Sequence, residues 1–148
     1  MSRAEIMDWA PGSHASTFGG NPVSIAAALA TLEILSREGM ANAGRVGGMM
    51  LERLNGWKKT HPLVGDVRGR GLMIGVELVK DKATREPASA VRNRVETLAF
   101  ERGLMVLGCG ETTLRICPPL IVSEQEATVA LDILEEAITL AEKENQHA

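Results

Sequence analysis

Apolar residues recur at helical spacing in three parts of the chain, residues 41–59, 89–102 and 127–141, and each predicts an amphipathic helix. A fourth segment, residues 22–38, is apolar almost all round. A helix of that kind is typical of a position buried on most of its surface. Gly39 follows this segment, where a left-handed residue commonly ends a helix, so we expect the first helix to stop there.

Alternating apolar residues predict a small sheet among these helices. Residues 64–68 and 72–79 form the first predicted pair of strands, and residues 104–107 and 113–117 form the second. The longest strand places four apolar side chains on one face, at Leu72, Ile74, Val76 and Leu78. Helices before, between and after the strands predict an α+β fold in which a small, mostly antiparallel sheet carries helices on one face.

Two short motifs refine this prediction. Ser123 and Glu126 have the spacing of a capping box, which predicts that the last helix begins between them. The glycines on either side of Arg70 resemble the start of a dinucleotide-binding fingerprint, but a strand follows them where that fingerprint needs a helix. Gly75 also comes one residue too late to complete it. The glycines therefore predict a turn between two strands.

Composition and charge exclude several classes of partner. The chain has 148 residues, of which 45% are hydrophobic, and a formal net charge of −3. Lysine and arginine are scattered, so no basic patch for nucleic acid or an anionic membrane stands out. With 2 Trp, 2 Phe and no Tyr, the chain also offers no stacking platform for single strands. No apolar run is long enough for a membrane span, and no secretory signal opens the chain, so we expect a cytoplasmic protein.

The segment from Ser16 to Pro22 predicts an anion site at the entrance of the first helix. Asn21 is a natural N-cap, Pro22 suits the first helical position, and two glycines precede them. Small residues here leave backbone N–H groups and the hydroxyls of Ser16 and Thr17 free to approach a phosphate-sized ligand. An ordinary capped helix after a glycine loop is the structural alternative.

Arg115 is the second candidate for a binding residue. It lies on a strand whose neighbouring residues point to the core, so its side chain is predicted on the opposite face. There it is either simply solvated or grips a carboxylate with its planar guanidinium. Cys109 and Cys117 are the only cysteines, and no further ligands accompany them, so we expect reduced thiols and no metal site.

Three separated segments resemble class III (omega-amino-acid) aminotransferases, which depend on pyridoxal 5'-phosphate. They are STFGGNPVSIAAALA at residues 16–30, HPLVGDVRGRGLMIGVE at 61–77 and LRICPPL at 114–120. The resemblance implies that Thr17, with Ser16 beside it, binds the cofactor phosphate, usually from the neighbouring subunit of a homodimer. It implies that Arg115 holds the substrate carboxylate. The 4-aminobutyrate and acetylornithine aminotransferases and related racemases share these motifs, with amino acids and keto acids as substrates.

The same resemblance implies how the chain is organised. Residues 1–39 correspond to an arm and helix at the junction with a large domain, and residues 40–148 to the C-terminal small domain of fold-type I enzymes. The family's Schiff-base lysine lies upstream of the matching segments. Each lysine present here lies in a polar run, which favours a solvated amine, so we expect no catalytic residue and no transaminase activity from this chain alone. Two alternatives to an aminotransferase remain: a non-catalytic ligand-binding or dimerisation module, and a racemase of the same family.

Overall fold

The computed structural model describes residues 4–10 and 12–146. The chain forms two compact units, Met1–Ser36 and Arg37–Ala148. In the first unit a short 3-10 turn, Ala4–Ile6, precedes the helix α1, Pro22–Ile34. Within the described residues, no helix combines the length and the apolar character that a membrane crossing requires.

The start of α1 matches the prediction. Asn21 is the N-cap, and its side-chain oxygen accepts hydrogen bonds from the backbone N–H groups of Val23 at 2.9 Å and Ser24 at 3.2 Å. None of the residues of α1 is buried, and Val23 and Leu29 are 78% and 63% exposed. Within this chain the prediction of a buried helix is therefore wrong.

The predicted stop at Gly39 is also wrong. A π-helical turn, Leu35–Gly39, follows α1 directly and leads into the helix α2, Met40–Thr60. Gly39 is buried and has a φ of −61°, which is right-handed helical backbone. A glycine permits the left-handed conformation that ends a helix but does not require it, so it lets the helical backbone continue here.

The second unit contains a sheet with the strand order β1-β2-β5-β4. The strands are β1 Val64–Arg70, β2 Met73–Asp81, β4 Leu107–Cys109 and β5 Thr113–Ile116, and all neighbours are antiparallel. A two-residue strand, β3 Glu86–Pro87, pairs with β2. The first predicted hairpin is confirmed, and Gly71, with a φ of +56°, provides the left-handed backbone of its turn.

The strand predicted at residues 104–107 begins later than expected. Pairing starts only at Leu107, which lies opposite Arg115, and ends where Cys109 lies opposite Thr113. The turn at Gly110, with a φ of +60°, sets this register. Just before β4, Leu104 and Val106 pack on the core instead of pairing, and Val106 is only 7% exposed, whereas Met105 is 75% exposed.

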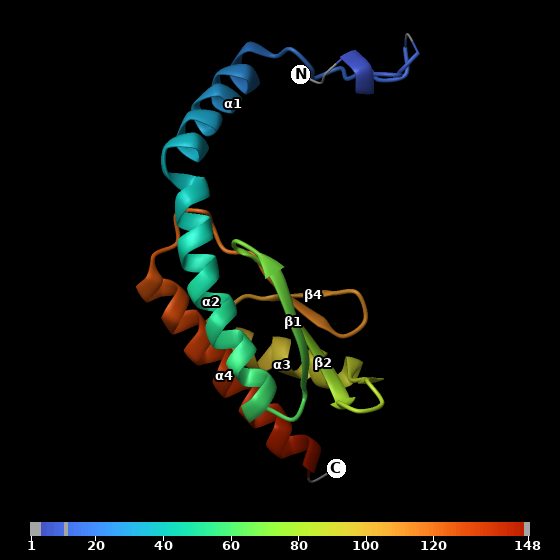
Figure 1. Ribbon diagram of the computed structural model, residues 1–148, viewed down its shortest axis with the longest axis vertical. Coiled ribbons are helices and arrows are strands. Elements are labelled where there is room, and N and C mark those ends of the chain that lie inside the picture. Colours follow the sequence, from blue (N-terminus) through green and yellow to red (C-terminus); the bar gives the residue numbers. More distant parts are fainter. Residues whose placement is uncertain (1–3, 11, 147–148) are drawn as a thin grey trace. The chain divides into compact units, whose positions relative to one another are not determined.

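Three helices cover one face of the sheet: α2, α3 Ser89–Glu101 and α4 Glu124–Gln146 (Figure 1). The sheet side chains that face them, at Ile74, Val76, Leu78 and Leu114, are 0–1% exposed. Burying each side chain of this size contributes about 1.5–3 kcal/mol relative to leaving it in water. The α+β fold, with a small antiparallel sheet and helices on one face, is therefore confirmed.

The capping box of α4 is confirmed as well. The Glu126 carboxylate accepts hydrogen bonds from the Ser123 backbone N–H at 2.9 Å and from its hydroxyl at 2.7 Å. In return, the Glu126 N–H donates to the Ser123 hydroxyl oxygen at 3.2 Å. The backbone hydrogen bond, and then the hydroxyl, lower the pKa of Glu126. Its contribution to stability is therefore present above its ordinary pKa and is lost as the pH falls through the lowered one.

Candidate functional site

The loop before α1 presents two hydroxyl groups to solvent. The Gly19 N–H donates to the Ser16 carbonyl at 3.2 Å, and Gly20 follows with a φ of +77°. Ser16 and Thr17 are exposed, and neither hydroxyl makes a hydrogen bond within the described part of the chain. A Cβ added at Gly20 would meet nothing within 4 Å, so the space beside this residue is open.

The N-cap changes which groups at this helix entrance are free. The N–H groups of Val23 and Ser24 are already bound to the side chain of Asn21. The donors that remain for a ligand are therefore the hydroxyls of Ser16 and Thr17 together with the amides of the turn. The expectation that Thr17 offers a free hydroxyl agrees with this geometry, whereas the first turn of α1 has fewer free donors than the sequence predicts.

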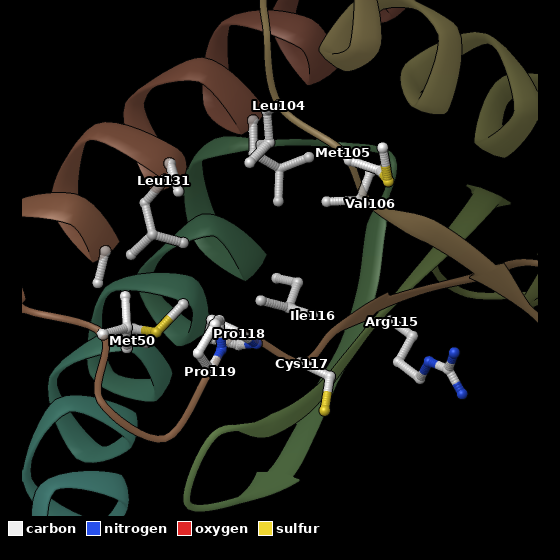
Figure 2. Close-up of a pocket in the computed structure, with 14 residues that line it drawn as sticks. Met50, Leu104, Met105, Val106, Arg115, Ile116, Cys117, Pro118, Pro119 and Leu131 are labelled. Atoms are coloured by element: carbon white, nitrogen blue, oxygen red, sulfur yellow. The ribbon is translucent and has the colours of Figure 1, made fainter.

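Arg115 lies on the face of the sheet that carries no helix. Gly75 is its direct neighbour on β2, and Leu107 is its direct neighbour on β4. The Arg115 side chain is exposed and makes no hydrogen bond or ion pair with any described residue. Figure 2 shows its guanidinium directed away from the apolar side chains nearby. Arg115 is therefore a cation on an open surface, as its position in the strand predicts.

A network of charges lies beside Arg115 on the same face. The guanidinium of Arg68 contacts the Glu77 carboxylate at 2.7 Å and the Asp66 carboxylate at 3.1 Å. It also donates to the Thr113 hydroxyl at 3.2 Å, so it spans β1, β2 and β5. The hydrogen bond with Glu77, and then that with Asp66, raises the pKa of Arg68. The sequence places Glu77 on this face, but only the structure identifies its partner.

An apolar pocket of about 280 Å³ opens where β4 and β5 diverge (Figure 2). Its lining includes Met50, Leu104, Val106, Ile116, Leu131 and Leu134, and Arg115 also borders it. Sequence reasoning missed this pocket because its walls come from α2, α4 and two strand ends that are distant in the chain. It places apolar surface next to the candidate carboxylate-binding residue.

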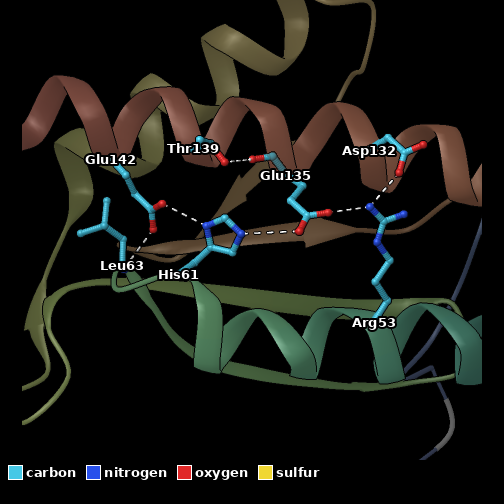
Figure 3. A network of polar contacts seen from close by, with 7 residues as sticks. All are labelled: Arg53, His61, Leu63, Asp132, Glu135, Thr139 and Glu142. Atoms are coloured by element: carbon cyan, nitrogen blue, oxygen red, sulfur yellow. Dashed lines mark hydrogen bonds and ion pairs between the residues drawn. The ribbon is translucent and has the colours of Figure 1, made fainter.

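A second polar network joins α2 to α4 (Figure 3). The ring of His61 lies between two carboxylates, with Nδ1 3.0 Å from Glu142 and Nε2 3.6 Å from Glu135. Glu135 also pairs with Arg53 at 2.5 Å. His61 is 8% exposed, and nothing in the sequence indicates this arrangement. Among the described residues, no group of three or more histidine, cysteine or acidic side chains has the arrangement that a metal ion needs.

The candidate residues belong to different units. Ser16 and Thr17 lie in the first unit, and Arg115 lies in the second. Cys109 and Cys117 are free and exposed. Cys109 pairs with Thr113 in the sheet, so the two cysteines do not face each other across β4 and β5.

Comparison with known proteins identifies the family. A family model described as aminotransferase class-III matches residues 1–138. The chain is similar to a leucine/methionine racemase of Thermococcus litoralis, with 43% identity over 97% of this chain and 33% of that protein. It is also similar to a 4-aminobutyrate aminotransferase of Mycobacterium bovis, with 41% identity over 89% of this chain and 30% of that protein. The chain thus spans about a third of the length of these curated relatives.

Solved structures agree with this result. A transaminase from directed evolution by ancestral reconstruction superposes with a TM-score of 0.83 and 34% identity, over 90% of this chain and 30% of that one. An aminotransferase of Bacillus anthracis gives a TM-score of 0.80 and 37% identity, over 85% of this chain and 30% of that one. The family model, over residues 1–138, covers both the glycine loop before α1 and the strand that carries Arg115. This chain therefore belongs to the class-III aminotransferase family.

Proposed function

We propose that this chain is the C-terminal part of a pyridoxal-phosphate-dependent aminotransferase that moves an amino group from an omega-amino acid, such as 4-aminobutyrate, to a keto acid. The family match over residues 1–138 carries this proposal. Residues 1–39 then form the junction with a large domain, and residues 40–148 form the small domain. The activity belongs to the whole protein, because the chain corresponds to about a third of its relatives.

The residues before α1 fit the phosphate group of the cofactor. Hydroxyls and turn amides are the donors that phosphate oxygens accept from, and both Ser16 and Thr17 have hydroxyls without a partner among the described residues. The open space beside Gly20 lets the backbone approach the anion. When bound, pyridoxal 5'-phosphate supplies the electron sink for the reaction. The role of Thr17, with Ser16 beside it, is to hold that cofactor in place.

Arg115 then orients the substrate carboxylate. We expect Arg115→Gln to weaken the binding of a simple carboxylate such as pentanoate by about tenfold, because a charge-assisted contact contributes roughly 1.5–3 kcal/mol and solvent screening reduces it here. The measurement is an NMR titration of the backbone amides of Gly75 and Leu114. Folding should be unaffected, since the side chain is exposed and without a partner in the described structure.

The matched control for this experiment is Arg70→Gln. Arg70 is also exposed and also makes no contact with a described polar group, but it lies on the edge strand β1. The same charge is removed, so a purely electrostatic attraction to the chain falls equally in both variants. Equal losses in the two variants would contradict a specific role of Arg115.

The lysine that binds the cofactor covalently lies, on this proposal, in a part of the protein outside this chain. Lys80 pairs with Glu86 at 2.7 Å, and Lys82 donates to the Lys58 carbonyl. Lys59, Lys80, Lys82 and Lys143 are exposed, and Lys58 is half-buried. None of the five is enclosed in an apolar site, which such chemistry requires.

A labelling experiment tests this assignment. After incubation with pyridoxal phosphate and reduction with borohydride, mass spectrometry should find label spread over the exposed lysines at low occupancy. Labelling with the aldehyde pyridoxal, which lacks the phosphate, is the control for general amine reactivity. A stoichiometric adduct on one lysine that requires the phosphate would show that the chain does contain the catalytic amine.

We also propose that the intact protein is a homodimer and that α1 lies in a protein interface. The helix exposes Val23, Ile25, Leu29 and Leu32, each at least 48% exposed, and covering such a surface is strongly favourable in water. The chain by itself should therefore associate at high concentration, as measured by sedimentation equilibrium. Replacing Leu29 and Leu32 by glutamate should restore a monomer, and a wild-type chain that stays monomeric at all concentrations would contradict the proposal.

A racemase is the second candidate function. The leucine/methionine racemase of Thermococcus litoralis and an alanine/serine racemase of Pyrococcus horikoshii are each 43% identical to the matching part of this chain. The two activities differ in their products. A racemase converts one L-amino acid into its D-form without consuming a keto acid, whereas an aminotransferase consumes the keto acid and releases a new amino acid. Incubating the intact protein with one L-amino acid, with and without pyruvate, and measuring D-amino acid and alanine separates them.

A further inference from the structure

The surroundings of Arg115 on the open sheet face are asymmetric in charge. Along β2, Gly75 lies directly opposite Arg115, and Glu77 lies opposite Thr113, two residues further along β5. Glu77 is therefore a diagonal neighbour of Arg115, at a separation of about 7–8 Å. The diagonal neighbour on the other side, Met73, is uncharged and 66% exposed.

Gly75 leaves the space between Arg115 and the neighbouring strands open. A Cβ at this position would lie 3.0 Å from the Thr113 methyl group and 3.9 Å from the Cγ of Arg68. Glycine therefore leaves no side-chain atom on the sheet surface at this point. A carboxylate bound to Arg115 has room to extend over this residue. The rest of the ligand then lies within the field of the charges that flank Gly75.

Those charges carry a net negative balance. Asp66 and Glu77 contribute two carboxylates, and Arg68, the only cation bound to them in the described part of the chain, contributes one guanidinium. The Arg68 guanidinium donates to both carboxylates and to the Thr113 hydroxyl. These donors are therefore occupied and are not directed at a ligand on Arg115. A ligand on Arg115 thus meets one uncompensated negative charge on this flank. The exposed Arg70, opposite Met73 on β1, places a cation on the other flank.

We propose that Glu77 is a specificity-determining residue, which disfavours a second carboxylate on the Glu77 side of the Arg115 site. This inference rests on the proposed carboxylate-binding role of Arg115. A second anionic group on the ligand is repelled by the carboxylates of Glu77 and Asp66, whereas an apolar or amine-bearing end is not. For a ligand carboxylate held about 7–8 Å from that of Glu77 in solvent, one such repulsion changes affinity by about threefold, and by more where water is excluded.

The test compares a monocarboxylate and a dicarboxylate of equal length on the full chain. Pentanoate and glutarate are titrated at matched ionic strength, and binding is followed by the NMR signals of the Arg115 and Arg68 guanidinium groups. In the wild type, Arg115 should respond to pentanoate and Arg68 should not. In Glu77→Gln, the affinity for glutarate relative to pentanoate should rise about threefold. Asp66→Asn should act in the same direction with a smaller effect, because Asp66 lies on the edge strand.

The control variant is Glu86→Gln, which removes an equal charge from a carboxylate paired with Lys80 on a different strand. It should leave the glutarate-to-pentanoate ratio unchanged. If the ratio stays constant in Glu77→Gln, or rises equally in both variants, the inference about Glu77 is wrong while the role of Arg115 stands. If the Arg115 signal responds to neither acid, the carboxylate-binding role itself is overturned, and the inference falls with it.

Discussion

Replacing Gly47 by alanine is expected to destabilise the second unit by about 3 kcal/mol or more. A Cβ at Gly47 would lie 2.1 Å from the carbonyl oxygen of Gly71 and 2.8 Å from its Cα. These atoms belong to the backbone of the β1–β2 turn, which, unlike the end of a flexible side chain, cannot turn aside. Overpacking of a core typically costs about 1–3 kcal/mol, and a clash with backbone lies at the upper end. Urea or thermal unfolding measures the change.

The neighbouring residue provides a control on the same helix. Gly48 is exposed, and a Cβ there meets nothing within 4 Å. Gly48→Ala should stabilise the chain slightly, by up to about 1 kcal/mol, because alanine is the better helix former. The two substitutions are chemically identical, so opposite signs isolate the contact between α2 and the turn. If Gly47→Ala is as stable as the wild type, the close approach of α2 to Gly71 is wrong.

Glu142→Ala should produce the second large loss of stability, about 2–4 kcal/mol. The Glu142 carboxylate binds His61 Nδ1 at 3.0 Å and accepts from the Leu63 backbone N–H at 3.4 Å (Figure 3). His61 is 8% exposed, so removal of the acceptor leaves two donors in a site that water reaches poorly. An unsatisfied buried donor costs about 1–3 kcal/mol. Equilibrium unfolding in urea, with an unchanged slope, checks the prediction.

Glu144→Ala is the matched control, two residues further along α4. Its carboxylate pairs with Arg94 at 2.7 Å, but the side chains of Arg94 and Glu144 are 42% and 49% exposed. The hydrogen bond with Arg94 lowers the pKa of Glu144, and solvent screens most of the associated energy. Stability should therefore change little. Equal effects of the two substitutions would contradict a specific role for the contact between α4 and His61.

Local sequence patterns predicted the elements of this chain well where all residues of the pattern belong to a single strand, turn or helix end. The alternation in β2, the turn at Gly71 and the capping box of Ser123 and Glu126 are all confirmed. Each depends on neighbours at most a few residues apart, so the chain itself contains the information. The boundary of the first helix was missed because Gly39 allows two backbone conformations and only its burial selects one.

The candidate site divides in the same way. Asn21 and the exposed position of Arg115 follow from helix capping and strand alternation. The partners of Glu77, and the network of charges beside Arg115, depend on which strands become neighbours. Sequence spacing contains no such information. The pocket near Ile116 was missed for the same reason, because its walls come from several distant segments.

By itself the sequence determined the order of helices and strands, the faces that each presents, and the family to which its motifs point, because these depend on short-range spacing. Only the tertiary structure decided the register of β4, the approach of Gly47 to Gly71, and the contact of His61 with α4. Each of these joins residues that are far apart in the chain. Their distances depend on how complete elements pack against one another, and that packing is a collective property of the whole core.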